Sequence, residues 1–269
     1  MLVACLKGLR VEAALATRNL RYHCPGCQAE VILKRGRRVC AHFAHKARST
    51  CSGSRGETQA HLELKAAITR VLRDRGLRAE PEYTMATIPW ERRADVMVWA
   101  PRTNSPIAIE LQRSALPIRE LETRALSYCR MGIAQFWIAF LPPRILDDAL
   151  QVNENEWLIP RYTPRQHELW IHGQNNFEGC WMADPETGRF WHASLEPHHL
   201  TTKEAIWYEM GAIKQYRRST TRLSKRYRDL RLTGPFDLQN LKIKTAVTRA
   251  TETAYFKWPG GKIATFTHD

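Results

Sequence analysis

The sequence predicts a mixed α/β protein in which a core of one helix, three strands, a second helix and a further strand lies between two unlike flanks. Residues 57–75 carry apolar side chains at helical spacing, and residues 136–141 form an unbroken apolar run. Four of the seven cysteines fall within residues 24–51. We therefore expect a cysteine-rich β module, a core domain, and an aromatic and basic C-terminal domain, over residues 1–53, 54–150 and 151–269.

The charge of the chain favours a polyanionic partner. The formal net charge is +14 at pH 7. Residues 1–53 contain ten Lys or Arg and two acids, whereas residues 54–150 contain fourteen Lys or Arg and twelve acids. Basic flanks around an acid-rich middle are typical of proteins that bind nucleic acid and carry out metal chemistry on it. The alternative is a soluble protein that is merely basic.

The expected cellular compartment is inferred from two sequence features, membrane-spanning segments and signal peptides. No apolar run approaches the ~20 residues that a membrane-spanning helix needs. The first residues also lack the apolar region and cleavage site of a signal peptide. We therefore expect a cytoplasmic protein with no membrane partner, in which clustered cysteines bind metal rather than form disulfides.

The first part is expected to be a small β module. Residues 1–20 alternate apolar and polar side chains around Lys7-Gly8, which predicts two short strands joined by a turn. A hairpin over residues 31–39, turning at Arg35-Gly36, is expected to follow.

A metal ion is expected to hold this module together. Cys24-Pro-Gly-Cys27 places two thiolates on one tight turn, which is half of a structural zinc site. The hairpin would return the chain to that turn, and we expect Zn²⁺ to be held by Cys24, Cys27, His45 and Cys51. His42 is the alternative to His45, and unligated thiols are the alternative to a metal.

Residues 57–75 predict an amphipathic helix, preceded by Gly56 and stopped by Gly76. Glu57, His61 and Lys65 follow at intervals of four residues along or beside its apolar stripe. A buried carboxylate without a partner is costly, so we expect Glu57 to meet a metal or a base. The alternative is a solvated Glu57 that favours the helix N-terminus.

Two carboxylates stand within apolar strands. Residues 80–84, 95–99 and 107–112 read as three strands, the last two separated by a loop containing Pro and Asn. Asp95 and Glu110 occupy positions where an apolar residue would be the easier choice. Because adjacent strands bring their side chains together, we expect Asp95 and Glu110 to share one Mg²⁺ or Mn²⁺ ion.

A second helix is expected after Pro117, ending near Gly132. Its Arg124 and Tyr128 lie one turn apart, where they could contact a nucleic-acid backbone or pack the helix on the sheet. The apolar run at residues 136–141 then predicts a central strand.

The last third combines aromatic and basic segments. Residues 151–200 contain four tryptophans that either stack on unpaired bases or form a core, with a hairpin around residues 184–188. Residues 202–231 predict a long helix whose second half carries eight Lys or Arg and one acid. We expect its basic face to bind phosphates, with an acidic protein partner as the alternative. That face comprises Arg218, Arg222, Lys225 and Arg226.

Together these motifs resemble the competence protein CoiA-like family of the PD-(D/E)xK nuclease superfamily. The resemblance covers roughly residues 1–145 and rests on six motifs: Cys24-Pro-Gly-Cys27, His42-Phe-Ala-His45, Glu57-x-x-x-His61-x-x-x-Lys65, Arg93-Ala-Asp95-Val, Ile109-Glu110-Leu-Gln112-x-Ser114 and Arg124-x-x-x-Tyr128. It implies a restriction-endonuclease-like core behind a zinc-ribbon-like module. Gln112 stands where many members of the superfamily have lysine, and Lys65 is the candidate for that missing cation.

The resemblance implies a deoxyribonuclease that depends on Mg²⁺ or Mn²⁺ and hydrolyses phosphodiester bonds. Its substrate would be single- or double-stranded DNA, including branched forms, in bacterial DNA uptake, recombination or defence, alongside recombination proteins. The expected catalytic residues are Asp95, Glu110, Gln112, Glu57, His61 and Lys65. The competing hypothesis, favoured by Gln112, is a catalytically silent DNA-binding or recombination-accessory protein that keeps the fold.

Overall fold

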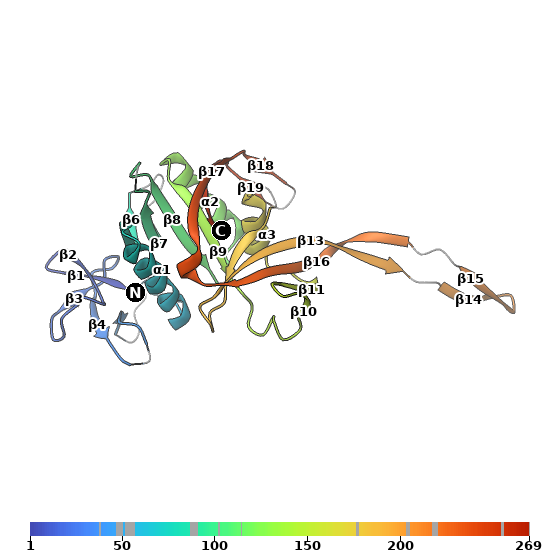
Figure 1. The fold of residues 1–269 in the computed structure, drawn as a ribbon, viewed down its shortest axis with the longest axis horizontal. Coiled ribbons are helices and arrows are strands. Elements are labelled where there is room, and N and C mark those ends of the chain that lie inside the picture. The colour runs from blue at the N-terminus through green and yellow to red at the C-terminus, as the bar shows by residue number, and fades with distance from the viewer. Residues whose placement is uncertain are drawn as a thin grey trace.

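The structure is a computed structural model, and it describes residues 1–37, 39–46, 51, 57–86, 91–101, 103–113, 115–175, 178–202, 205–216, 220–253 and 256–268. Ser114 and Arg218 lie outside these residues. Figure 1 shows a small N-terminal β module, a large sheet with helices against it, and a long two-stranded arm. Within the described residues, no helix is both long and apolar enough to cross a membrane.

The N-terminal module is a five-stranded antiparallel sheet in the order β2-β1-β3-β4-β5. Its strands are β1 (Val3–Leu6), β2 (Leu9–Glu12), β3 (Tyr22–His23), β4 (Glu30–Lys34) and β5 (His42–His45). The predicted turn at Lys7-Gly8 is confirmed, since both residues have positive φ and Leu6 pairs with Leu9. The predicted hairpin within residues 31–39 is wrong, because the returning strand is β5 and Ile32 pairs with Ala44. Among the described residues, the burial seen at Val31 in β4 returns only at Phe43 in β5.

The middle of the chain has the predicted order of elements. These are α1 (Gln59–Asp74), β6 (Ala79–Met85), β7 (Arg92–Trp99), β8 (Pro106–Gln112), α2 (Ile118–Arg130) and β9 (Ala134–Phe140). All seven residues of β9 are buried and it pairs in parallel with β8, which confirms the predicted central strand. Helix α1 begins later than expected, because the Thr58 hydroxyl caps it by accepting from the His61 N–H at 3.3 Å.

The large sheet continues past residue 150 in the order β10-β11-β16-β13-β12-β9-β8-β7-β6, with β17 and β20 attached beside β9. The remaining elements are β10 (Leu150–Asn153), β11 (Glu156–Tyr162), α3 (Gln166–Gln174), β12 (Cys180–Ala183), β13 (Phe190–Thr202), β14 (Ala205–Glu209), β15 (Ala212–Tyr216), β16 (Thr220–Phe236), the 3₁₀ turn Leu238–Asn240, β17 (Lys242–Thr248), β18 (Thr251–Glu252), β19 (Lys257–Trp258) and β20 (Gly261–Thr267). The rings of Trp137, Trp170 and Trp258 meet edge to face at 5.2 and 5.6 Å, so one core spans the middle and last parts of the chain.

The tryptophans of the last third mostly form core. Trp170, Trp181 and Trp191 are buried, and the hairpin predicted around residues 184–188 is the turn between β12 and β13. The core interpretation of these rings is therefore confirmed for these three positions.

The predicted helix over residues 202–231 is wrong. The segment forms the hairpin β14–β15 and the first half of β16, which pairs with β13 over most of its length (Figure 1). Gly211 lies in the middle of the segment with φ +78, a conformation that interrupts a helix and closes a hairpin. Runs of Ile, Trp, Tyr and Thr on both sides of that glycine favour strands.

Candidate active site

Three carboxylates lie on neighbouring strands of the large sheet. The register pairs Val96 with Ile109, which places Asp95 on β7 opposite Glu110 on β8. On β6, Pro81 pairs with Val96 and Tyr83 pairs with Ala94 of β7. Glu82 therefore lies opposite Asp95. Directly opposite residues in an antiparallel pair have their Cβ atoms about 5 Å apart. The sheet therefore brings the three acids into one row across β6, β7 and β8.

Asp95 is held by groups from α1 and β8. One oxygen, Oδ2, lies 3.1 Å from His61 Nε2 and accepts the Leu111 N–H at 2.9 Å. The other, Oδ1, lies 3.7 Å from Lys65 Nζ. Burial alone would raise the pKa of Asp95, but His61, Lys65 and the Leu111 N–H outweigh it and hold that pKa below its ordinary value. Asp95 and His61 keep 18 % side-chain exposure, so solvent still reaches the middle of the row.

Lys65 is the cation at the centre of the row. Its ammonium donates to Glu82 Oε1 at 2.7 Å and to Glu57 Oε1, and its side chain is fully buried. Burial would lower the pKa of Lys65, but the surrounding carboxylates together raise it above its ordinary value. Lys65 therefore stays charged and neutralises part of a strongly acidic cluster.

Glu57 lies before the helix, not on it. It reaches Lys65 and, through Oε2, the Met1 ammonium at 2.9 Å. The prediction that Glu57 meets a base is consistent with these contacts, whereas the prediction of a helical line starting at Glu57 is wrong because Thr58 caps α1.

Glu82 was not among the residues expected from the sequence. Its backbone has φ +50, and its carboxylate accepts the N–H groups of Leu2 at 2.9 Å and Val3 at 3.3 Å. Burial would raise the pKa of Glu82, but Lys65 outweighs it and lowers the pKa to about 2. Glu82 thus joins the N-terminal module to Lys65. The sequence signal that could have identified Glu82 was a carboxylate in the middle of an expected strand. The partners of Glu82 become evident only once the strands are paired.

Two residues of α2 contact Glu110. It accepts the hydroxyl hydrogen of Tyr128, and Arg124 Nη1 lies 3.5 Å from Oε2. Burial and the charge of Asp95 raise the pKa of Glu110 to about 7. Tyr128 is buried with its hydroxyl on Glu110, and burial raises its own pKa well above the ordinary value. Gln112 is buried two residues further along β8.

The raised pKa of Glu110 leads to a testable dependence of stability on pH. A folded pKa of about 7, against the ordinary 4.5, stabilises the fold below pH 4.5, and this contribution is lost as pH rises through 7. Without added Mg²⁺ or Mn²⁺, Glu110→Gln is expected to gain up to about 3 kcal/mol of unfolding free energy relative to the wild type between pH 4.5 and 7.5. Urea unfolding at several pH values measures the difference. Glu186→Gln, at an exposed turn, is the matched control, and parallel curves for Glu110→Gln and the wild type would contradict the assignment.

A second constellation lies in the N-terminal module. The ligand atoms of Cys24, Cys27, His45 and Cys51 lie within 4.8 Å of one another. The sulfurs of Cys24 and Cys51 are 3.8 Å apart, and Cys27 Sγ lies 3.3 Å from His45 Nε2. Two thiolates bound tetrahedrally at 2.3 Å stand roughly 3.8 Å apart, so the three cysteines and one histidine fit a zinc ion.

The environment of Cys27 and the position of His42 agree with such a metal centre. The N–H of Ala29 and the ring of His45 lower the pKa of Cys27 to about 7, which favours the thiolate that zinc requires. His42 is not part of the cluster, because its Nδ1 lies 3.0 Å from the Cys40 carbonyl oxygen. The group that could hold a metal therefore has the expected members, with His45 rather than the alternative His42.

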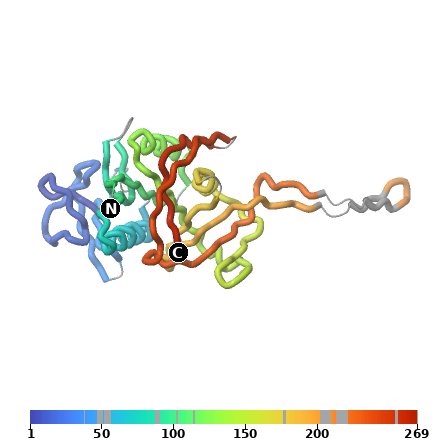
Figure 2. The backbone as a smooth tube through the Cα atoms, turned by 45° about the horizontal axis from the view of Figure 1, so that its top comes forward, coloured from blue at the N-terminus to red at the C-terminus, as the bar shows by residue number. Residues whose placement is uncertain are grey.

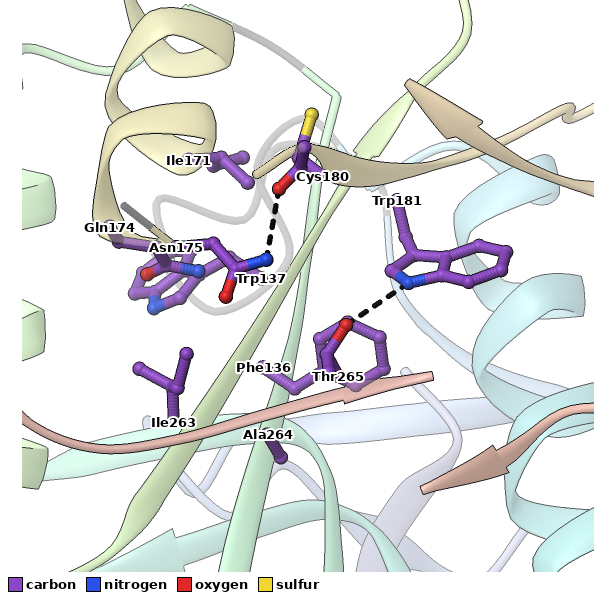
Figure 3. A pocket seen from close by; sticks show the side chains of 11 residues that line it. Phe136, Trp137, Ile171, Gln174, Asn175, Cys180, Trp181, Ile263, Ala264 and Thr265 are labelled. Carbon is purple, nitrogen blue, oxygen red and sulfur yellow. Dashed lines mark hydrogen bonds between the residues drawn. The ribbon is translucent and has the colours of Figure 1, made fainter. Parts of the chain in front are cut away.

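Figure 3 shows a pocket between β9, α3, β12 and β20, and no residue of either constellation lines it. Its lining is largely apolar and aromatic, including Phe136, Trp137 and Ile263. At its edge the Trp181 indole donates to Thr265 Oγ1 at 3.1 Å. Its lining includes none of the three carboxylates, so we do not place the chemistry there.

Comparisons with known proteins agree with these two constellations. Residues 6–54 match the model of the competence protein CoiA N-terminal domain, and residues 57–209 match the model of the CoiA nuclease-like domain. No curated protein and no solved structure matches the chain. The first match contains the Cys and His cluster, and the second contains the carboxylate row and covers more than half of the chain. The chain therefore belongs to the competence protein CoiA family and carries its nuclease-like domain.

Proposed function

We propose that this chain is a metal-dependent nuclease that hydrolyses DNA phosphodiester bonds in bacterial DNA uptake, recombination or defence. The observation that carries the proposal is the placement of Asp95 opposite Glu110, each held by a different helix. We also assign α1, β6, β7, β8, α2 and β9 to a PD-(D/E)xK nuclease core. The order of these elements and the position of the two acids support that assignment.

The donor set fits a hard divalent cation. Asp95 and Glu110 offer carboxylate oxygens, and their mutual repulsion, which contributes to the raised pKa of Glu110, is what a bound cation would relieve. Mg²⁺ or Mn²⁺ held by these two residues would supply a Lewis acid and lower the pKa of bound water. The partial exposure of Asp95 leaves the site open to a phosphodiester at that residue.

The other residues prepare the site. His61 and the Leu111 N–H fix one oxygen of Asp95, while Tyr128 fixes one oxygen of Glu110. Preorganised ligands avoid reorganisation when the substrate arrives. His61, half-buried beside Asp95, is the group best placed to receive or hold a proton near the attacking water. Gln112 is neutral, so its amide can only hydrogen-bond water or a phosphate oxygen.

A catalytically silent DNA-binding or recombination-accessory protein is the second candidate. It is favoured by the state of Lys65, which is fully buried and already paired with Glu57 and Glu82. A lysine so neutralised has little charge left for the scissile phosphate, and Gln112 supplies none.

A cleavage assay separates the two candidates. Full-length protein is incubated with single-stranded, double-stranded and branched DNA in Mg²⁺ and in Mn²⁺. We expect cleavage by the wild type and a loss of at least about 100-fold in Asp95→Asn and Glu110→Gln, whose folding is checked by circular dichroism. Asp148→Asn, which neutralises an exposed acid outside the row, should cleave as the wild type does.

Two outcomes contradict parts of the proposal. Full cleavage by both site variants would show that the acids were assigned wrongly. Binding of DNA without cleavage in either metal would establish the accessory function instead.

A further inference from the structure

The arm is built from the outer halves of β13 and β16. Residues 199–202 of β13 pair with residues 220–223 of β16, and Figures 1 and 2 show this ribbon leaving the body of the protein. The hairpin β14–β15 lies beyond its outer end (Figure 1). In the described part of the chain, no layer of helices or strands covers this two-stranded ribbon. The ribbon therefore has no hydrophobic core of its own. Its shape therefore calls for a partner outside the chain.

The charge of the arm selects the kind of partner. The described residues 197–202, 205–216 and 220–228 contain five Lys or Arg and one acid. Arg222, Lys225 and Arg226 are exposed on β16. The Ser224 hydroxyl accepts the Arg226 N–H at 3.2 Å and the Tyr227 N–H at 2.8 Å, which forms a bulge in the ribbon at these basic residues. An exposed strand with clustered positive charge complements a phosphate backbone.

The tip of the arm carries an unusual residue. Glu209 pairs with Ala212, so Met210 and Gly211 form a two-residue turn with φ of +50 and +78. Such turns favour Asn, Asp or Gly at the first position, because a side chain at positive φ is strained. Met210 occupies that position and is fully exposed, at 103 % of its reference area. A strained, exposed apolar side chain at the end of a basic ribbon indicates that Met210 makes an apolar contact with the partner that the arm binds.

We infer that the arm grips duplex DNA, with Arg222, Lys225 and Arg226 on the phosphates and Met210 wedged between base pairs in the minor groove. Apolar side chains, methionine among them, serve as such wedges because they stack against bases that they partly separate. The energy of unstacking is offset by phosphate contacts along the ribbon. The partner is thus double-stranded DNA that is bent at the tip.

This inference deepens the proposed function, since it names duplex DNA as the ligand of the same chain. It replaces the basic helix face expected from the sequence with a basic ribbon, on which Arg222, Lys225 and Arg226 are retained. Binding is measured without cleavage, so it succeeds or fails independently of nuclease activity.

The first test measures the phosphate contacts. Full-length Asp95→Asn protein is titrated into a fluorescein-labelled 30-base-pair duplex at several salt concentrations, without added divalent metal. Replacing Arg222, Lys225 and Arg226 with alanine is expected to weaken binding about tenfold or more and to reduce the slope of log affinity against log salt by about 2–3. The control replaces Lys244, Arg249 and Lys262, which are exposed on other strands and loops. Equal losses in both triple variants would overturn the arm as the binding element.

The second test measures the wedge. The same duplex carries 2-aminopurine, whose fluorescence rises when its neighbours unstack, and a donor–acceptor pair at its ends reports bending. We expect both signals with the wild-type arm, their loss in Met210→Ala, and their retention in Met210→Leu and in Val247→Ala, an exposed apolar control outside the arm. A wild-type complex without unstacking, or an unchanged signal in Met210→Ala, would overturn the wedge. An acidic protein partner would be indicated by arm variants that bind DNA as tightly as the wild type.

Discussion

Replacing Lys65 with methionine is expected to lower the free energy of unfolding by about 3–5 kcal/mol, because it removes the cation from a buried cluster of carboxylates. Lys65 contacts Glu57 and Glu82 directly and lies 3.7 Å from Asp95. Without it these acids repel one another in a poorly solvated site, and some must take up protons. Chemical denaturation at pH 7 measures the loss.

Two further variants show whether the charge of Lys65 is responsible. Lys46→Met removes an exposed ion pair with Glu30 and should cost less than about 1 kcal/mol. Adding Glu82→Gln to Lys65→Met should recover part of the stability, because one of the unpaired charges is gone. A loss in Lys65→Met no greater than in Lys46→Met would contradict the ion-pair account.

We propose that the Cys and His cluster holds a structural zinc ion, and removing that ion is expected to unfold the N-terminal module. Four ligands from three separate stretches of chain converge there, and a structural zinc of this kind contributes on the order of 10 kcal/mol at neutral pH. We expect about one zinc per chain by elemental analysis. A strong chelator should abolish amide protection of residues 1–45 in hydrogen exchange while the large sheet keeps its own.

Single substitutions identify the ligands. Cys51→Ser and His45→Ala should lose zinc, whereas Cys40→Ser and His42→Ala should retain it, since neither residue belongs to the cluster. Full zinc content in His45→Ala, or its loss in His42→Ala, would reverse the assignment of the histidine ligand.

The middle of the chain was predictable because its patterns are local. Helix α1 and strand β9 follow from apolar spacing alone, and the paired Asp95 and Glu110 follow from two short strands joined by a loop. The Cys24 and Cys27 half of the metal cluster was predictable because Cys24-Pro-Gly-Cys27 forms a turn by itself. Each of these predictions requires only neighbours in sequence or one strand pairing.

The arm and Glu82 were not predictable in the same way. The basic stretch around Arg222 has the composition of a helix surface, and its long-range pairing with β13 holds it as a strand. Glu82 acquires its partners from Leu2 and Val3, which are 80 and 79 residues away in sequence. Tertiary pairing decided both, although Gly211 and the strand-forming residues on either side of it were a local signal against a helix in the arm.

The contact of Glu82 with the backbone of Leu2 and Val3 affects how this protein should be dissected. The family models divide the chain between residues 54 and 57, which invites expression of the second segment alone. Such a fragment would lack the two N–H donors that share the Glu82 carboxylate with Lys65. Low activity in that fragment would therefore report a damaged ionic cluster rather than an inactive enzyme, and negative results are interpretable only with both segments present.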